Sequence, residues 1–129
     1  MIVVLSHELS AAELEAMIGL MPDRAWLRGD RIGRSGRAFQ PFSGWSVGAE
    51  PSEEPAAAHI SAVLHRVAEV RNNIAAAAAD PRVHSVALWV WSHGPAFGLE
   101  LPPSRLIEIA GLGATLKIDV YSVDESEQP

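Results

Sequence analysis

The sequence predicts one α+β domain, a two-layer sandwich in which a mixed or antiparallel sheet of about six short strands carries three helices on one face. The length of 129 residues fits a single domain covering 1–129. A 48% share of hydrophobic residues with 20% charged residues fits a packed core and argues against disorder. Short apolar runs alternate with segments of helical spacing, in the order strand, helix, strand repeated three times.

The first unit starts with a buried strand at Ile2–Ser6. A helix follows at about 10–19, because Ser10 and Glu13 form a capping box and Gly19 gives a stop signal. Arg24–Arg28 is then predicted to form a second strand. These repeated units give an architecture close to ferredoxin-like folds.

The middle of the chain begins with a long loop at 29–44, because glycine and proline are frequent there. A strand is expected at Trp45–Gly48. The helix after it starts at Pro51, with its acidic first turn at the positive end of the helix dipole. An apolar stripe and the polyalanine Ala75–Ala79 extend it, with a kink at Asn72-Asn73.

The strongest strand signal is Val83–Ser92, which is rich in valine and tryptophan. Ala96–Leu101 is predicted to return as its hairpin partner. A helix opens at Pro102-Pro103 and closes at Gly111-Leu112-Gly113, and the last strand is Leu116–Tyr121. The acidic tail 122–129 is expected to be frayed.

The alternation of side chains along these strands predicts two different sheet faces. Aliphatic residues at every second position form the face that the helices cover. The other face, the reverse face, is expected to hold all four tryptophans and several ionisable groups: Trp26, Arg28, Trp45, Trp89, Trp91, His93, Lys117, Asp119 and Tyr121. Tryptophan, tyrosine and arginine are typical of interfaces, so this face is a binding surface or a homodimer seam. The alternative is that the 29–44 loop and the hairpin cover it as a second, minor core.

Five of the ten basic residues lie within fourteen positions: Arg24, Arg28, Arg31, Arg34 and Arg37. Guanidinium groups bind phosphates and carboxylates, so this segment is a candidate site for an anionic ligand or an acidic partner. The competing interpretation is a solvated loop, or one neutralised by Glu50, Glu53 and Glu54.

The sequence contains no catalytic signature. Its glycines do not match a phosphate loop or a dinucleotide fingerprint, and its histidine spacing predicts no metal site. One acid–base cluster is conceivable, at His93, Asp119 and Tyr121, if their strands are neighbours. No nucleophile accompanies it. No cofactor is predicted.

The net charge of −6 argues against nucleic-acid binding. The chain has no cysteine, which permits a reducing compartment. No signal peptide or membrane-spanning run is recognisable, so we expect a cytoplasmic protein without a membrane partner.

The order of these pieces resembles a bacterial family known as domain of unknown function 4279. The resemblance rests on a capped first helix ending Ile18-Gly19-Leu20 with Pro22-Asp23, and continues over nearly the whole chain with short, degenerate motifs. These are Arg28-Gly29-Asp30, Arg37, Trp45, the helix bearing Leu64, Gly111-Leu112-Gly113 and Ile118-Asp119-Val120-Tyr121. It implies a small α+β protein without an established activity, and singles out Arg37, Trp45, Asp119 and Tyr121. Pro102-Pro103 departs from the serine or threonine cap expected there.

Two functions therefore stand as hypotheses. The first is a non-enzymatic binding protein, such as an immunity-type or regulatory partner, that uses the aromatic face and the arginine segment to bind another protein or itself. The second is a small enzyme or ligand-binding domain centred on His93, Asp119 and Tyr121.

Overall fold

The computed structural model describes residues 1–33, 37–48, 55–93 and 98–121, and for residues 92, 93, 120 and 121 it describes the backbone alone. The described residues form an α+β fold with a five-stranded mixed sheet, a separate two-stranded ribbon and four α-helices. The strands are β1 (Ile2–Ser6), β2 (Arg24–Trp26), β3 (Arg31–Ile32), β4 (Ala38–Phe39), β5 (Ser43–Val47), β6 (Val83–His93) and β7 (Thr115–Tyr121). The helices are α1 (Ala11–Ile18), α2 (Ala56–Arg66), α3 (Arg71–Ala79) and α4 (Pro103–Gly111), with a 3-10 turn, η1 (Ala68–Val70), before α3.

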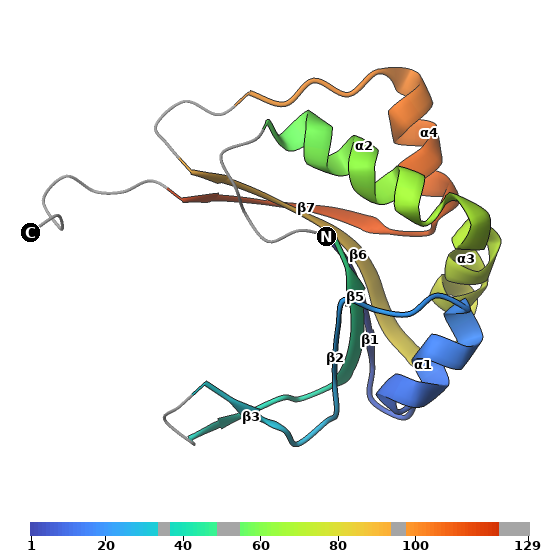
Figure 1. Cartoon of the computed structure of the whole chain (residues 1–129), viewed down its shortest axis with the longest axis vertical. Helices are drawn as coiled ribbons and strands as arrows, with labels where there is room; N and C mark the ends of the chain where they lie inside the picture. Colours follow the sequence, from blue (N-terminus) through green and yellow to red (C-terminus); the bar gives the residue numbers. More distant parts are fainter. Residues whose placement is uncertain (34–36, 49–54, 94–97, 122–129) are drawn as a thin grey trace, which may run out of the picture.

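The helices lie on one side of the sheet, as the sequence predicts (Figure 1). The strand order is β2-β5-β1-β6-β7. Strand β1 is antiparallel to both β5 and β6, and β2 is antiparallel to β5. The connections β1-α1-β2 and β5-α2-α3-β6 therefore each join two parallel strands that have one strand between them. This is the split β-α-β arrangement of ferredoxin-like folds, to which α4 and β7 add a fifth strand parallel to β6.

The first helix is fixed by the predicted local signals. Ser10 Oγ accepts a hydrogen bond from the Glu13 amide, and the Glu13 carboxylate accepts one from the Ser10 amide, which completes the capping box. Gly19 ends α1 with a φ of 80°, and its amide donates to the Glu15 carbonyl. Such a left-handed residue favours glycine, which explains the stop signal.

The core lies between the helices and one face of the sheet. Ile2 and Val4 in β1 are fully buried and pair with residues of β5 and β6 that belong to the same hydrophobic cluster. The β1–β6 register shifts between Leu5 and Ser6. Because of this bulge, Val83 and Val86 both belong to the core cluster although they lie three positions apart.

The long second helix is divided at a different place from the predicted kink. The break lies at Val67–Val70, between α2 and α3, and the Asn72-Asn73 pair lies inside α3. Asn73 is held there because its side-chain amide donates a 2.9 Å hydrogen bond to the Ile18 carbonyl at the end of α1. After this turn, α3 packs against α1 as well as on β6.

The segment 29–44 is not only a loop, because it contains the β3–β4 ribbon, in which Arg31 pairs with Phe39. The ribbon leaves the end of the sheet and projects away from the helices (Figure 1). Its base is closed by two hydrogen bonds, from the Gly29 amide to the Gln40 carbonyl at 2.8 Å and from the Gln40 amide to the Asp30 carbonyl at 2.7 Å.

The prediction of a hairpin partner at Ala96–Leu101 is wrong in its described part, since residues 98–101 form no strand. At this end β6 pairs with β7 over Ala87–His93, so its described partner comes from the last strand and not from residues 98–101. Leu99 and Leu101 instead pack against the core. The predicted helix start at Pro51 is wrong, because α2 begins at Ala56 and has no acidic residue in its first turn. Residues 51–54 and the tail 122–129 lie outside the described residues. No helix in the described ranges is long and apolar enough to cross a membrane.

The turn from α3 into β6 is organised by one carboxylate. Asp80 accepts hydrogen bonds from the Arg82 amide at 2.9 Å and from the Arg82 guanidinium at 2.8 and 3.1 Å. These bonds, the side-chain ones first, lower the pKa of Asp80 to about 2. The folded state therefore favours the ionised form.

We predict that Asp80→Asn lowers stability at pH 7. A depressed carboxyl pKa contributes stability that is present above the ordinary value of 3.8 and is lost as the pH falls through about 2. Urea unfolding at pH 7, 4 and 3 should show the largest difference between the variant and the wild type at pH 7, and a smaller one at pH 3. Glu69→Gln, an exposed change outside this turn, is the control and should show no such trend. A pH-independent difference for Asp80→Asn contradicts the prediction.

Candidate functional site

The reverse face of the sheet carries the main candidate site. In β6, Val86, Leu88 and Val90 are core residues, so Trp89 and Trp91, which alternate with them, point to the opposite side. Lys117 and Asp119 take the same side in β7, because the register pairs them with Trp89 and Trp91. No described helix covers this side (Figure 1).

Trp89, Trp91 and Lys117 form a compact group. The two indole rings stack with centroids 5.8 Å apart and an angle of 14° between their planes. Lys117 Nζ lies 4.9 Å from the centroid of the Trp89 ring, within the range of a cation–π interaction. Both tryptophans are half-buried and Lys117 is exposed. The group therefore combines a flat aromatic surface with a positioned positive charge.

Trp26 belongs to the same face at the opposite edge of the sheet. It pairs with Gly44 in β5, and its indole lies directly over that glycine. A methyl group on Gly44 would overlap the ring carbons Cζ2 and Cε2 of Trp26. The buried indole nitrogen of Trp26 makes no hydrogen bond with the described residues. Glycine is thus required at 44 for Trp26 to lie flat on the sheet.

The prediction that Trp45 shares this face is wrong. Trp45 is fully buried in the core, and its indole nitrogen donates a 2.9 Å hydrogen bond to the Leu20 carbonyl. It pairs with Val4, whose side chain faces the helices, so the register places the indole in the same layer. The tryptophan is therefore a structural residue that links β5 to the end of α1.

The proposed acid–base cluster is tested only at the backbone. Strands β6 and β7 are neighbours, and their register pairs His93 with Tyr121 and Trp91 with Asp119. The three positions thus lie at one end of two adjacent strands. The side chains of His93 and Tyr121 are outside the described part, so their interaction with Asp119 stays a prediction.

The described arginines of this segment are spread over several elements and do not converge on one site. Arg24 lies in β2 of the main sheet, whereas Arg31 lies in β3 of the ribbon, and Arg37 precedes β4. Arg28 is placed in the turn by its amide, which donates to Ser43 Oγ at 2.9 Å. All four are exposed. Arg34, Glu50, Glu53 and Glu54 lie outside the described residues.

Sequence reasoning missed an aromatic cluster where the ribbon leaves the sheet. Phe42 stacks on His84 at 4.2 Å between ring centroids and meets His7 edge-on at 5.3 Å. These residues flank the ends of three adjacent strands, β1, β5 and β6. Predicting this cluster from the sequence would have required the correct antiparallel pairing of these three strands.

Among the described residues no group of three His, Cys, Asp or Glu side chains is placed to hold a metal ion.

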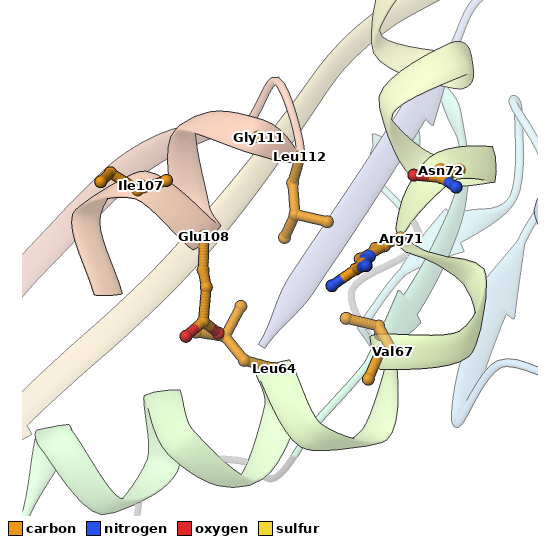
Figure 2. A pocket seen from close by; sticks show the side chains of 9 residues that line it. Leu64, Val67, Arg71, Asn72, Ile107, Glu108, Gly111 and Leu112 are labelled. Carbon is orange, nitrogen blue, oxygen red and sulfur yellow. The ribbon is translucent and has the colours of Figure 1, made fainter. Parts of the chain in front are cut away.

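A cavity of about 310 Å³ on the helix side was also missed. Leu64, Val67 and Leu112 are buried and form its apolar floor. Figure 2 shows the Arg71 guanidinium directed into this space and the Glu108 carboxylate on the opposite wall.

The two charged walls of this cavity differ in their bonding. Glu108 is bound by Arg105 at 3.1 and 3.2 Å, and Arg105 also donates to Ser61 Oγ at 2.8 Å. Arg71 makes no ion pair with the residues that the structure describes. Within that part of the chain, a cation without a counter-ion therefore lines an apolar space whose carboxylate is already neutralised. This cavity could form only once α2, α3 and α4 had met, which is why no sequence motif marks it.

We predict that Gly44→Ala destabilises the domain by about 1–3 kcal/mol, the usual cost of forcing an extra methyl group into a packed site. The Trp26 indole must leave its place on the sheet, so its fluorescence should shift toward that of a more solvated indole. The Trp26 signal is obtained by subtracting spectra of Trp26→Phe variants. Gly98→Ala is the control, because a methyl group there meets nothing within 4 Å. Equal stability of Gly44→Ala and Gly98→Ala would overturn this account of position 44.

Comparison with known proteins places the chain by family alone. Residues 1–123 match a family described as a domain of unknown function, DUF4279. No curated protein and no solved structure matches the chain. The match covers nearly the full sequence and agrees with the resemblance seen in the motifs. The chain therefore belongs to the DUF4279 family.

Proposed function

We propose that this domain is a non-enzymatic binding protein, an immunity-type or regulatory partner, which recognises another protein through the reverse face of its sheet. The observation that carries this proposal is the stacked Trp89–Trp91 pair with Lys117 beside it, half-exposed on a side that no described helix covers. Tryptophan is among the residues that most often dominate the binding energy at protein interfaces.

The shape of the face favours a protein partner over a small ligand. Strands β2 and β6 carry its aromatic groups, and β5 and β1 lie between them. Gly44, Leu5, Val3 and Ala87 occupy this centre, and Val3 and Ala87 are already buried. The half-exposed aromatic groups at either side of it are therefore spread over a wide surface, as in a protein interface.

The arginine segment supports an acidic character for the partner. Arg24 takes the same side of β2 as Trp26, two positions away. Arg28 and Arg31 follow toward the exposed ribbon. Positive charge at the rim of an aromatic surface accelerates association with an acidic surface and makes it depend on salt. We place this binding in the cytoplasm, because a chain without cysteine suits a reducing compartment.

We predict that Trp89→Ala with Trp91→Ala abolishes capture of a specific partner from the cells of origin while the fold persists. Truncation of a hot-spot tryptophan costs about 2 kcal/mol or more, so a tenfold or larger loss of affinity is expected. Immobilised wild type and variant are compared by quantitative mass spectrometry, with circular dichroism reporting the fold.

The matched control is Ile107→Ala. This residue is 72% exposed on α4, on the helix side of the molecule. Proteins that bind the wild type and this control, but not the double tryptophan variant, support the proposal. Capture that Ile107→Ala abolishes and the tryptophan variant leaves intact moves the binding surface to the helices and refutes it.

A second candidate function is the binding of a small carboxylate, and one observation favours it: Arg71, without an ion pair among the described residues, is directed into the apolar cavity of about 310 Å³. This volume lies at the lower end of the range for ligand pockets.

The enzyme hypothesis is an acid–base role for His93, Asp119 and Tyr121. It is supported by the pairing of β6 with β7. The cavity lies on the helix side, whereas Asp119 takes the reverse face, so these are two separate hypotheses.

We predict that benzoate and 4-phenylbutyrate raise the melting temperature of the wild type, whereas their neutral amides do not. Arg71→Ala should abolish the effect, because the guanidinium supplies the charge that the carboxylate pairs with. Arg31→Ala, an exposed change on the distant ribbon, serves as the control and should leave the effect intact. Equal shifts for acids and amides, or for wild type and Arg71→Ala, would exclude this role for the cavity.

A further inference from the structure

Strand β7 presents an unusually open edge. It is seven residues long and pairs with β6 on one side, and no described strand pairs with its other side. Neither proline nor a bulge interrupts it. Such an edge offers a row of backbone donors and acceptors to another strand. The edge at the other end of the sheet, β2, is only three residues long.

The side chains of β7 alternate in a self-complementary way. Lys117 and Asp119 occupy the reverse face on either side of Ile118, which takes the helix face with Val90 as its neighbour. Val90 is 4% exposed, but Ile118 is 44% exposed. The open edge thus combines an uncovered apolar side chain with one positive and one negative neighbour.

We propose that β7 pairs antiparallel with β7 of a second copy of this chain, about a two-fold axis at Ile118. In this register Ile118 lies opposite Ile118 of the second copy. Lys117 of each copy then lies opposite Asp119 of the other, so the symmetry makes the same opposite-charge contact twice. Directly opposite residues have Cβ atoms about 4.5–5.5 Å apart, which is close enough for these pairs to stabilise the seam.

The charge order selects this arrangement over its neighbours. A shift by two residues in either direction breaks the pairing of Lys117 with Asp119. A shift by one residue breaks the match of faces, because it sets reverse-face positions opposite helix-face positions. Only the register centred on Ile118 satisfies both charges and buries both isoleucines against each other.

The dimer would join two five-stranded sheets into one ten-stranded sheet. Lys117 would then lie between Trp89 of its own chain, 4.9 Å away, and Asp119 of the second copy. The two tryptophan pairs would flank the seam on the same face. This inference goes beyond the proposed function, because the edge is used for self-association and the tryptophans stay available for a different protein.

Sedimentation velocity over a concentration series tests the pairing with Lys117→Asp and Asp119→Lys. Each variant alone sets like charges opposite each other twice, and its dimer should dissociate about tenfold or more readily than that of the wild type. In a one-to-one mixture, one variant supplies two acidic side chains and the other two basic ones. Both contacts are then between opposite charges, so heterodimers should form again. Glu69→Lys, an exposed reversal on η1, is the control and should dimerise like the wild type.

Restoration in the mixture supports the pairing, because a local structural defect in one strand would not be repaired by mixing. Three results would overturn it: a wild type that stays monomeric, a wild-type dimer that neither reversal weakens, or a loss that the mixture fails to restore. A dimer that Trp89→Ala disrupts and the charge reversals do not would be a face-to-face seam instead. A wild type that stays monomeric but still captures another protein through Trp89 and Trp91 refutes the β7 pairing and leaves the proposed function standing.

Discussion

The structure depends on the burial of one side of β1 beneath the helices. Ile2 and Val4 are inaccessible to solvent, and β1 is the strand through which the two halves of the sheet are joined. Since side chains alternate along a strand, burial of these two residues fixes which residues of β5 and β6 face the helices. The side chains at the alternate positions of these strands are therefore directed to the reverse face. The candidate surface is therefore a consequence of how the core is packed.

This dependence explains why the tryptophans divide as they do. Trp89 and Trp91 could be assigned from sequence, because three aliphatic residues alternate with them within one long strand. Trp45 could not, since serine and glycine precede it and neither states which face is buried. Its place follows from pairing with Val4, a contact between residues 41 positions apart in the chain. The sequence alone predicted that Trp45 lies on the reverse face, but the pairing of β5 with β1 places it in the core.

Local signals were sufficient for the start and stop of α1, for the start of α4, and for the order of the main elements. They failed where a contact between distant segments decides the outcome. The kink at Asn72-Asn73 was a reasonable expectation for two poor helix formers, but Asn73 gains a hydrogen bond to the Ile18 carbonyl that only tertiary packing supplies. The ribbon at Arg31 and Phe39 has strands of two residues each, too short for any periodic pattern. The cavity beside Arg71 belongs to this class as well, because three helical segments create it.

The addition of α4 and β7 to a ferredoxin-like arrangement has a further consequence for the site. Without β7, no described strand would lie beside Trp91, because β1 pairs with β6 only as far as Leu88. Strand β7 makes β6 an interior strand and places Lys117 against the Trp89 ring. Strand β7 itself becomes the edge of the sheet, and it carries Lys117 and Asp119, which have opposite charges. The fifth strand thus both orients the aromatic surface and supplies the edge at which that surface could be extended.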